Sequence, residues 1–320
     1  MLAALIITAA LAMVYANGAN ANFKGVASLF GSSTTSYWTA VRWAAVTTAA
    51  GCLAALFMPG TLLETFSGKG LVPNELVGRS DFLLAVGLGA AIANLLATRL
   101  GFPVSTTHML MGALLGAGLA AEPEGVRYAK LWDSFVKPLL ITPVLALVLG
   151  GSLYLLLKLL RLAPDHRTPL LDSLHFLSAG AVGFARGMND SPKLLALLVG
   201  GGQINEAYGL LLVMLFIALG GFISARQVAD TLSHKITGMN PGQGFAANLA
   251  TSLLTTTASF HGLPVSTTHV SVGALLGIGI TTKQARWRTI VPVLMAWLIT
   301  LPCAGLLAAF MWWLVTLGGE

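Results

Sequence analysis

The sequence predicts an all-α polytopic membrane protein made of two inverted-topology repeats of about five segments each. Three observations predict this fold. Only 9% of the 320 residues are charged and 56% are hydrophobic, whereas soluble domains carry roughly 25% charged residues. Long apolar runs, each suited to a membrane helix, alternate with Gly, Pro and charge clusters. The two halves also repeat the same polar motifs.

The composition excludes several other classes of protein. The 18 basic and 12 acidic residues are too few to solvate a soluble protein of this length. Cys52 and Cys303 lie in apolar runs, which excludes a disulfide scaffold. The basic residues are scattered, so the net charge of +6 does not indicate nucleic-acid binding. The loops 120–134 and 160–172 leave no room for an ATPase module, and no cofactor is expected.

We expect ten apolar segments. They cover residues 2–31, 38–58, 82–99, 103–120, 135–160, 171–200, 206–224, 243–259, 264–281 and 288–316. The first is a membrane segment and not a signal peptide, since no positive charge precedes Lys24. It is broken at residues 17–20, and the sixth is broken at residues 187–192. Such breaks are tolerated in a membrane where the backbone faces protein or a water-filled cavity.

The fourth and ninth segments begin with the clearest repeat. Gly101-Phe-Pro-Val-Ser-Thr-Thr-His108 recurs as Gly262-Leu-Pro-Val-Ser-Thr-Thr-His269, 161 positions later. Gly18-Ala-Asn20 with Lys24 matches Gly187-Met-Asn189 with Lys193, 169 positions later. An odd number of segments in each half turns the second copy upside down, as in many secondary transporters.

The predicted repeats comprise residues 1–160 and 173–320, joined by a loop at residues 161–172. If all ten segments cross and both termini are outside, Lys and Arg favour the cytoplasmic side. The cytoplasmic loops then hold Arg42, Arg99, Lys158, Arg161, Arg167, Arg226, Lys235, Lys283, Arg286 and Arg288. The outer loops hold Lys69, Arg79, Arg127, Lys130 and Lys137. We expect the inner membrane of a bacterial or archaeal cell.

Each Pro-Val-Ser-Thr-Thr element is suited to start a helix, whose free N–H groups and positive partial charge bind oxyanions. Two such starts could bind one tetrahedral anion through backbone N–H groups and six hydroxyls. These hydroxyls belong to Ser105, Thr106, Thr107, Ser266, Thr267 and Thr268. They could instead bond to the preceding turn of a buried helix. His108 and His269 could orient these hydroxyls, titrate, or be ordinary interior histidines.

The broken segments carry polar groups at membrane depth. Asn20, Asn189 and Asp190 would form oxygen-rich cavities suited to cations. Lys24 and Lys193 lie in the same stretches, and ionisable residues inside a span are functional by default. The alternative for Lys24 is that its side chain extends to the outer surface.

These paired motifs resemble the PiT family of inorganic phosphate transporters over nearly the whole chain. The resemblance implies an inverted-repeat fold that moves phosphate, usually together with a cation. It further implies that the Ser-Thr-Thr helix starts bind phosphate. In the family the broken helices read Gly-X-Asn-Asp-X-Ala-Asn, and their Asp and Asn residues help to bind sodium.

This sequence departs from that pattern. Ala21 stands at the family's Asp, Lys24 and Lys193 stand at the second Asn of each copy, and Asp190 is kept. An ammonium group can take the place and charge of a bound sodium ion. We therefore expect no metal site, and transport that is independent of sodium and coupled to protons, or facilitated exchange. Asp190, Lys24, Lys193, His108 and His269 are the candidate coupling residues.

Several alternatives remain open at this point. The additional lysines favour sulfate, and Asp190, which can accept a proton from the substrate, favours phosphate. A sodium-coupled phosphate symporter, an anion channel and a homodimer are also open. A membrane hydrolase is disfavoured, because the sequence has no Gly-X-Ser-X-Gly element.

Overall fold

The protein is helical throughout the residues that the structure describes. The computed structural model describes residues 2–162, 167–202 and 204–317, and within them it forms helices and two isolated β-bridges but no strand. Six helical stretches are long and apolar enough to cross a membrane. They are Leu2–Ala21, Tyr37–Phe57, Ser80–Arg99, Tyr128–Leu159, Glu206–Ser224 and Trp287–Leu317. The prediction of an all-α polytopic membrane protein is confirmed.

The long helices coincide with the predicted segments to within a few residues. The first half contains α1 (Leu2–Ala21), α2 (Ala27–Gly31), α3 (Tyr37–Ala54), α4 (Thr61–Phe66), α5 (Ser80–Arg99), α6 (Thr106–Ala121), α7 (Tyr128–Leu131) and α8 (Lys137–Leu159). The second half contains α9 (Pro169–Val199), α10 (Glu206–Ser224), α11 (Arg226–Asp230), α12 (Pro241–Phe260), α13 (Thr267–Thr281) and α14 (Trp287–Leu317). The short helices α4 and α11 were not predicted, because neither is long enough to show a helical periodicity of apolar residues in the sequence.

The two predicted helix breaks have different outcomes. The first segment is interrupted, but not where the break was predicted, since residues 17–20 are helical, α1 ends at Ala21 and α2 begins only at Ala27. The second is wrong, because α9 continues through Pro192. Proline removes the backbone donor that would bond to the Met188 carbonyl four residues earlier. Neighbouring helices enclose this part of α9, and they can hold a helix together across a missing hydrogen bond.

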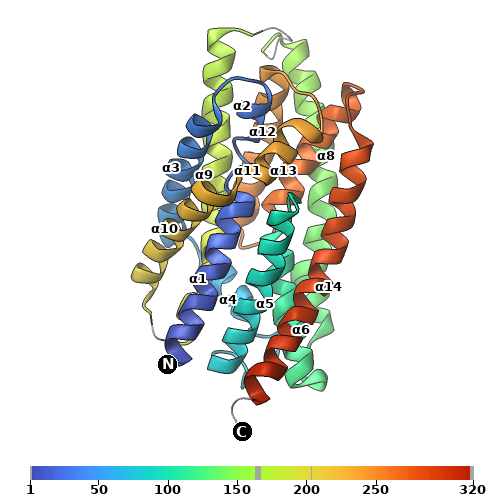
Figure 1. The fold of residues 1–320 in the computed structure, drawn as a ribbon. Coiled ribbons are helices and arrows are strands. Elements are labelled where there is room, and N and C mark those ends of the chain that lie inside the picture. The colour runs from blue at the N-terminus through green and yellow to red at the C-terminus, as the bar shows by residue number, and fades with distance from the viewer. Residues whose placement is uncertain (1, 163–166, 203, 318–320) are drawn as a thin grey trace.

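The pairs α5–α6 and α12–α13 form two helical hairpins. Their turns contain Gly101 and Gly262, whose φ angles of 74° and 67° are accessible to glycine. Ser105 and Ser266, which precede the second helix of each hairpin, are buried, whereas Leu100 and Phe260 beside the turns are 73% and 62% exposed. Figure 1 shows α5 and α6 in its lower half and α12 and α13 in its upper half, so each hairpin covers only part of the length of the bundle. This arrangement argues against the supposition that all ten segments cross, and it places Arg99 at a hairpin turn.

The described part of the chain begins and ends at the same end of the bundle, as an even total number of membrane crossings requires. Helix α1 begins and α14 ends at one end of the bundle, and α8 ends and α9 begins at the opposite end (Figure 1). This arrangement agrees with termini on one side of the membrane. Which side faces outward stays a prediction.

Glycines allow close approach of helices on both sides of the centre. A Cβ atom added at Gly18 of α1 would lie 2.2 Å from the carbonyl oxygen of Ile217 in α10. One added at Gly187 of α9 would lie 2.2 Å from the carbonyl oxygen of Thr48 in α3. Small residues at such crossings allow the van der Waals contact that drives helix association in lipid. The helices carrying both polar motifs are thereby fixed in place.

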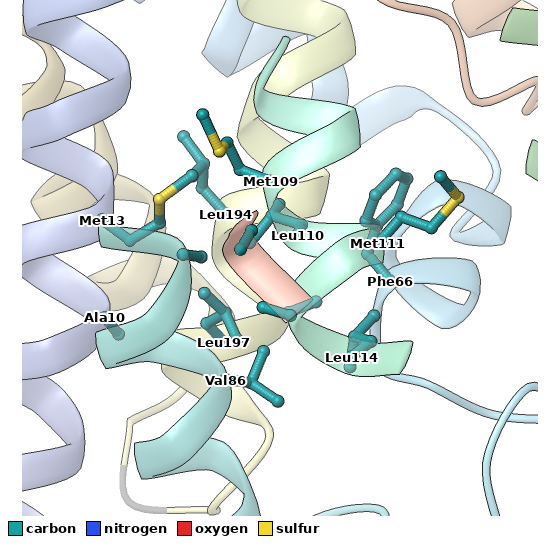
Figure 2. Packing of buried hydrophobic residues seen from close by; sticks show 14 of the residues in the cluster. Ala10, Met13, Phe66, Val86, Met109, Leu110, Met111, Leu114, Leu194 and Leu197 are labelled. Atoms are coloured by element: carbon teal, nitrogen blue, oxygen red, sulfur yellow. The ribbon is translucent and has the colours of Figure 1, made fainter. Parts of the chain in front are cut away.

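An apolar cluster packs the α5–α6 hairpin against α1 and α9. Figure 2 shows Met13 of α1, Val86 of α5, Leu110 of α6 and Leu194 of α9 converging there. Each of these side chains is at most 1% exposed. Because protein interiors are closely packed, the start of α6 is held at a fixed position relative to α1 and α9.

Candidate functional site

The two Pro-Val-Ser-Thr-Thr elements meet in the interior of the bundle. The Thr107 hydroxyl donates to the Val265 carbonyl at 3.0 Å, and the Thr268 hydroxyl donates to the Val104 carbonyl at 2.6 Å. The six predicted hydroxyl side chains are all buried. The structure thus brings together the starts of α6 and α13, as the sequence predicted.

The serine hydroxyls cap these helices. Ser105 Oγ accepts from the His108 backbone N–H at 3.2 Å, and Ser266 Oγ accepts from the His269 N–H at 3.2 Å. These oxygens bond to the turn that follows them in their own helices, as N-caps do, and not to a preceding turn. The other N–H groups of each first turn have no partner within the helix and remain suited to an anion. Thr106 Oγ1 accepts from Asn17 Nδ2 at 2.7 Å.

Both lysines point to the helix starts. Lys24 Nζ donates to the Val104 carbonyl at 3.0 Å, and Lys193 Nζ donates to the Val265 carbonyl at 2.8 Å. Lys24 is 3% exposed and Lys193 is 0% exposed. The alternative in which Lys24 extends to the outer surface is therefore wrong.

The Lys193 ammonium group is surrounded by oxygen atoms. It donates to Thr107 Oγ1 at 3.0 Å, to the Val265 carbonyl and to Asn189 Oδ1. Asp190 Oδ1 lies 3.6 Å away. Carbonyl, amide, hydroxyl and carboxylate oxygens are also the ligands that a hard metal cation takes.

The two predicted asparagines tie the helix starts to their neighbours. Asn20 Nδ2 donates to Thr98 Oγ1 at 3.0 Å, and its Oδ1 accepts from the Val104 N–H at 2.9 Å. Asn189 Nδ2 donates to Ser259 Oγ at 2.8 Å. Since their polar atoms are occupied in this way, the asparagines position the hairpins in this conformation.

Asp190 is the centre of a buried charge cluster. Its Oδ2 atom lies 3.4 Å from Arg186 Nε and accepts from Asn17 Nδ2 at 3.2 Å. Lys24 and Lys193 lie within its electrostatic reach. Three cations and one carboxylate, all at most 3% exposed, give a formal charge of +2. Such a charge is unfavourable in a low-dielectric interior unless a counterion balances it.

The partners of Arg186 were not predicted from the sequence. The guanidinium group donates to Asn17 Oδ1, to Asn22 Oδ1 at 3.1 Å and to Thr48 Oγ1 at 3.3 Å. Asn17 and Arg186 are 169 positions apart, which is also the separation between Gly18-Ala-Asn20 and Gly187-Met-Asn189. Extending the repeat alignment by one residue would have identified this pair.

The two predicted histidines lie beside the helix starts without bonding to the serine hydroxyls through their rings. The His108 and His269 rings contact each other at 4.6 Å between centroids, and His269 stacks on Trp297 at 3.9 Å. Both rings line an apolar cavity of about 600 Å³. Of the three roles left open for these histidines, orientation of the serine hydroxyls comes from the backbone N–H groups and not from the rings.

The helical bundle and its buried, positively charged centre define an integral membrane protein with a polar site at membrane depth. The sequence model of the phosphate transporter family matches residues 17–308. The chain therefore belongs to the phosphate transporter family, and it is a transporter and not an enzyme.

Known proteins and a solved structure are similar to this protein over nearly its whole length. A probable low-affinity inorganic phosphate transporter of Rhizobium meliloti (strain 1021) is 30% identical, covering 95% of this chain and 93% of that protein. A protein of the same description from Bacillus subtilis (strain 168) is 27% identical, covering 99% and 98%. A structure titled "The sodium-dependent phosphate transporter" matches with a TM-score of 0.87 and 21% identity, covering 99% of both chains. This last match shows that the fold is shared.

Proposed function

We propose that this protein is a secondary transporter of inorganic phosphate that works by alternating access, independently of sodium and with coupling to protons. The observation that carries the proposal is the buried charge of +2 beside two helix starts. An oxyanion at the helix starts would supply the missing negative charge, and the free N–H groups there would donate to it. The two lysines, Arg186 and Asp190 together carry a formal charge of +2, which a dianion neutralises. Without Arg186 the formal charge is +1, which a monoanion neutralises.

The proposed anion site is formed by both halves of the chain. Its donors are the backbone N–H groups and hydroxyls of Ser105, Thr106, Thr107, Ser266, Thr267 and Thr268, with Lys24, Lys193, Asn20 and Asn189 around them. The hydroxyl–carbonyl contacts between the two starts have to be exchanged for contacts with the anion. The contact pattern recurs at the separations of the sequence repeats, which supports two inverted repeats rocking about one site.

Phosphate is preferred over sulfate because Asp190 lies inside the cluster. A protonated phosphate donates a hydrogen bond and needs an acceptor such as this carboxylate, whereas sulfate at neutral pH needs donors alone. The names of the relatives support the same choice. Sulfate is the second candidate substrate, favoured by the three neighbouring cations.

Independence of sodium follows from the surroundings of Lys193. Its ammonium group occupies an oxygen-lined position, so no sodium ion has to be bound there in each cycle. We therefore take protons as the coupling ion. Asp190, Lys24 and Lys193 are the proposed proton carriers. His108 and His269 are weaker candidates, because their rings face an apolar cavity.

Uptake of radiolabelled phosphate into proteoliposomes tests this function. Uptake should persist when sodium is replaced by choline, increase with an inward proton gradient and saturate with phosphate. Excess sulfate should compete weakly. Loss of uptake in choline would contradict independence of sodium, and single-channel currents would indicate an anion channel in place of a transporter.

A further inference from the structure

An apolar cavity lies beside the proposed anion site, between helices of both halves of the chain. We name it the His108 cavity, and its volume is about 600 Å³, which is typical of sites for small molecules. Helices α6 and α8 line it from the first half, and α13 and α14 line it from the second half. None of its described lining residues carries a charge.

The mouth of the cavity opens on a face of the bundle that is suited to lipid. Leu140 and Val144 of α8 and Leu298 of α14 line the cavity, and they are 57%, 60% and 66% exposed. Both helices belong to stretches that are long and apolar enough to cross a membrane, and both lie on the right of Figure 1. A molecule dissolved in the bilayer can therefore enter without passing through water.

Two imidazole rings with unpaired nitrogen atoms also line the cavity. They belong to His108 and His269, and their ring centroids lie 4.6 Å apart. His108 Nδ1 and both ring nitrogens of His269 are buried and make no hydrogen bond, although the Leu139 backbone lies near the His269 ring. Buried polar atoms without a partner are rare in folded proteins, and a missing ligand is one explanation for them.

A second cavity of similar size provides a comparison within the same molecule. It has a volume of about 620 Å³ and is lined by residues of α5, α6 and α14. Its described lining contains no histidine and no charged residue. Its Thr300 hydroxyl already donates to the Trp297 carbonyl at 3.2 Å. Of these two cavities, the His108 cavity is the one whose lining includes unpaired ring nitrogens.

The chemistry of the His108 cavity defines the class of its ligand. Its walls favour an apolar body, and a charged group is disfavoured because the lining offers no opposite charge. A hydroxyl group can donate or accept, so it fits an imidazole in either tautomer. We propose that this cavity binds a neutral apolar molecule with one hydroxyl group, a phenol or a long-chain alcohol, which enters from the lipid. Its hydroxyl bonds to His108 Nε2, the one ring nitrogen of the pair that is not enclosed.

A ligand in this position acts on transport, because both repeats line the cavity. The backbone N–H groups of His108 and His269 bond to the serine caps of α6 and α13, so both rings belong to the first turns at the proposed anion site. Rocking of the repeats changes the shape of a cavity between them, and a ligand that fits one shape favours that conformation. This effect on transport rests on the proposed function, whereas occupancy of the cavity does not.

Two matched photoreactive probes test occupancy in the purified protein in liposomes. One probe is an alkylphenol with a diazirine group, and the other is the same molecule without its hydroxyl. Mass spectrometry compares labelling of α8 and α13, which line the His108 cavity, with labelling of α5, which lines the second cavity. The ratio of phenol to alkylbenzene labelling should be at least about fivefold higher on α8 and α13 than on α5, because only the phenol forms the additional hydrogen bond.

Three variants assign this preference to the histidine and to the mouth of the cavity. His108→Phe keeps a planar ring but removes its nitrogens, so the preference for the phenol should disappear while the alkylbenzene still labels α8 and α13. Leu298→Trp narrows the mouth and should reduce labelling of α13 by both probes. Leu314→Trp, at a 42% exposed position of α14 outside the lining, is the control. Equal ratios on the three helices of the wild type, or a preference that survives in His108→Phe, would overturn the site.

Phosphate–phosphate exchange in proteoliposomes tests the effect on transport. The probes are 2,6-diisopropylphenol and 1,3-diisopropylbenzene, and equal pH on both sides removes any effect of the phenol on a proton gradient. The phenol should slow exchange by the wild type and by Leu314→Trp at least about fivefold more strongly than the hydrocarbon does, and Leu298→Trp should resist it. Exchange that the phenol leaves unchanged would overturn the effect on transport. Absence of exchange in the wild type would contradict the proposed function, and the labelling ratios would still decide the site.

Discussion

The ammonium nitrogen of Lys193 lies 2.8 Å from the carbonyl oxygen of Val265, and the Lys24 nitrogen makes the equivalent contact with Val104 at 3.0 Å. Each lysine thus contacts the residue that precedes the serine cap of a hairpin helix. A built-in cation is thereby placed beside each proposed anion-binding helix start. The following predictions test what these two cations do.

Replacing Lys193 by Asn should make transport sensitive to sodium. The substitution introduces the asparagine that the resemblance to the PiT family implies at this position, beside Asp190. Its short side chain leaves the oxygens that surround the ammonium group without a cation. Uptake by Lys193→Asn should fall in choline and be partly restored by sodium. Lys235→Asn, at an exposed position, should transport as the wild type does, and equal uptake in both salts by Lys193→Asn would contradict the prediction.

Replacing Asp190 by Asn should strongly destabilise the protein. The change removes the only carboxylate of the cluster and raises its formal charge from +2 to +3. Removing one partner of a buried ion pair costs about 3–5 kcal/mol. Arg186→Met lowers the formal charge to +1 and should cost less. Thermal unfolding in detergent measures both variants, and a higher melting temperature for Asp190→Asn than for Arg186→Met would refute this account of the cluster.

Removing both serine caps should weaken substrate binding as well as lower stability. The double variant Ser105→Ala with Ser266→Ala loses two caps, each worth about 1 kcal/mol. If the hydroxyls also donate to a bound anion, the phosphate KM should rise by about tenfold or more. Ser36→Ala is the matched control, since Ser36 caps α3 at an exposed position. A KM as in the wild type would place these hydroxyls outside the anion site.

Replacing Gly18 by Val should separate α1 from α10. The new Cβ atom would lie 2.2 Å from the Ile217 carbonyl oxygen, and overpacking typically costs about 1–3 kcal/mol. Gly60→Val is the control, because a Cβ atom there meets nothing within 4 Å. The melting temperature should fall for Gly18→Val and change little for Gly60→Val. Equal values for the two variants would show that this close approach does not stabilise the bundle.

The repeated motifs allowed much of the fold and of the site to be predicted. Apolar runs located the long helices, and the paired Pro-Val-Ser-Thr-Thr elements predicted the two helix starts that meet at Thr107 and Thr268. The capping serine accounts for this success, whereas Pro103 and Pro264 lie before the helix caps and not in the first helical turn.

The errors arose where tertiary packing decides the outcome. Pro192 indicated a broken helix, but the neighbours of α9 hold it continuous. The contacts of Asn17 with Arg186 and Asp190 join residues more than 160 positions apart, and local patterns do not reveal them. The buried contacts of His175 with Ser28 and Thr34 were not predicted either, because single polar residues in apolar helices show no period.

Binding of radiolabelled phosphate to the purified protein without sodium tests the central claim most directly. The wild type should bind phosphate saturably in choline medium, and the double variant Lys24→Met with Lys193→Met should lose most of this binding while it stays folded. Binding by the wild type only when sodium is present, or full binding by the double variant, would contradict the account.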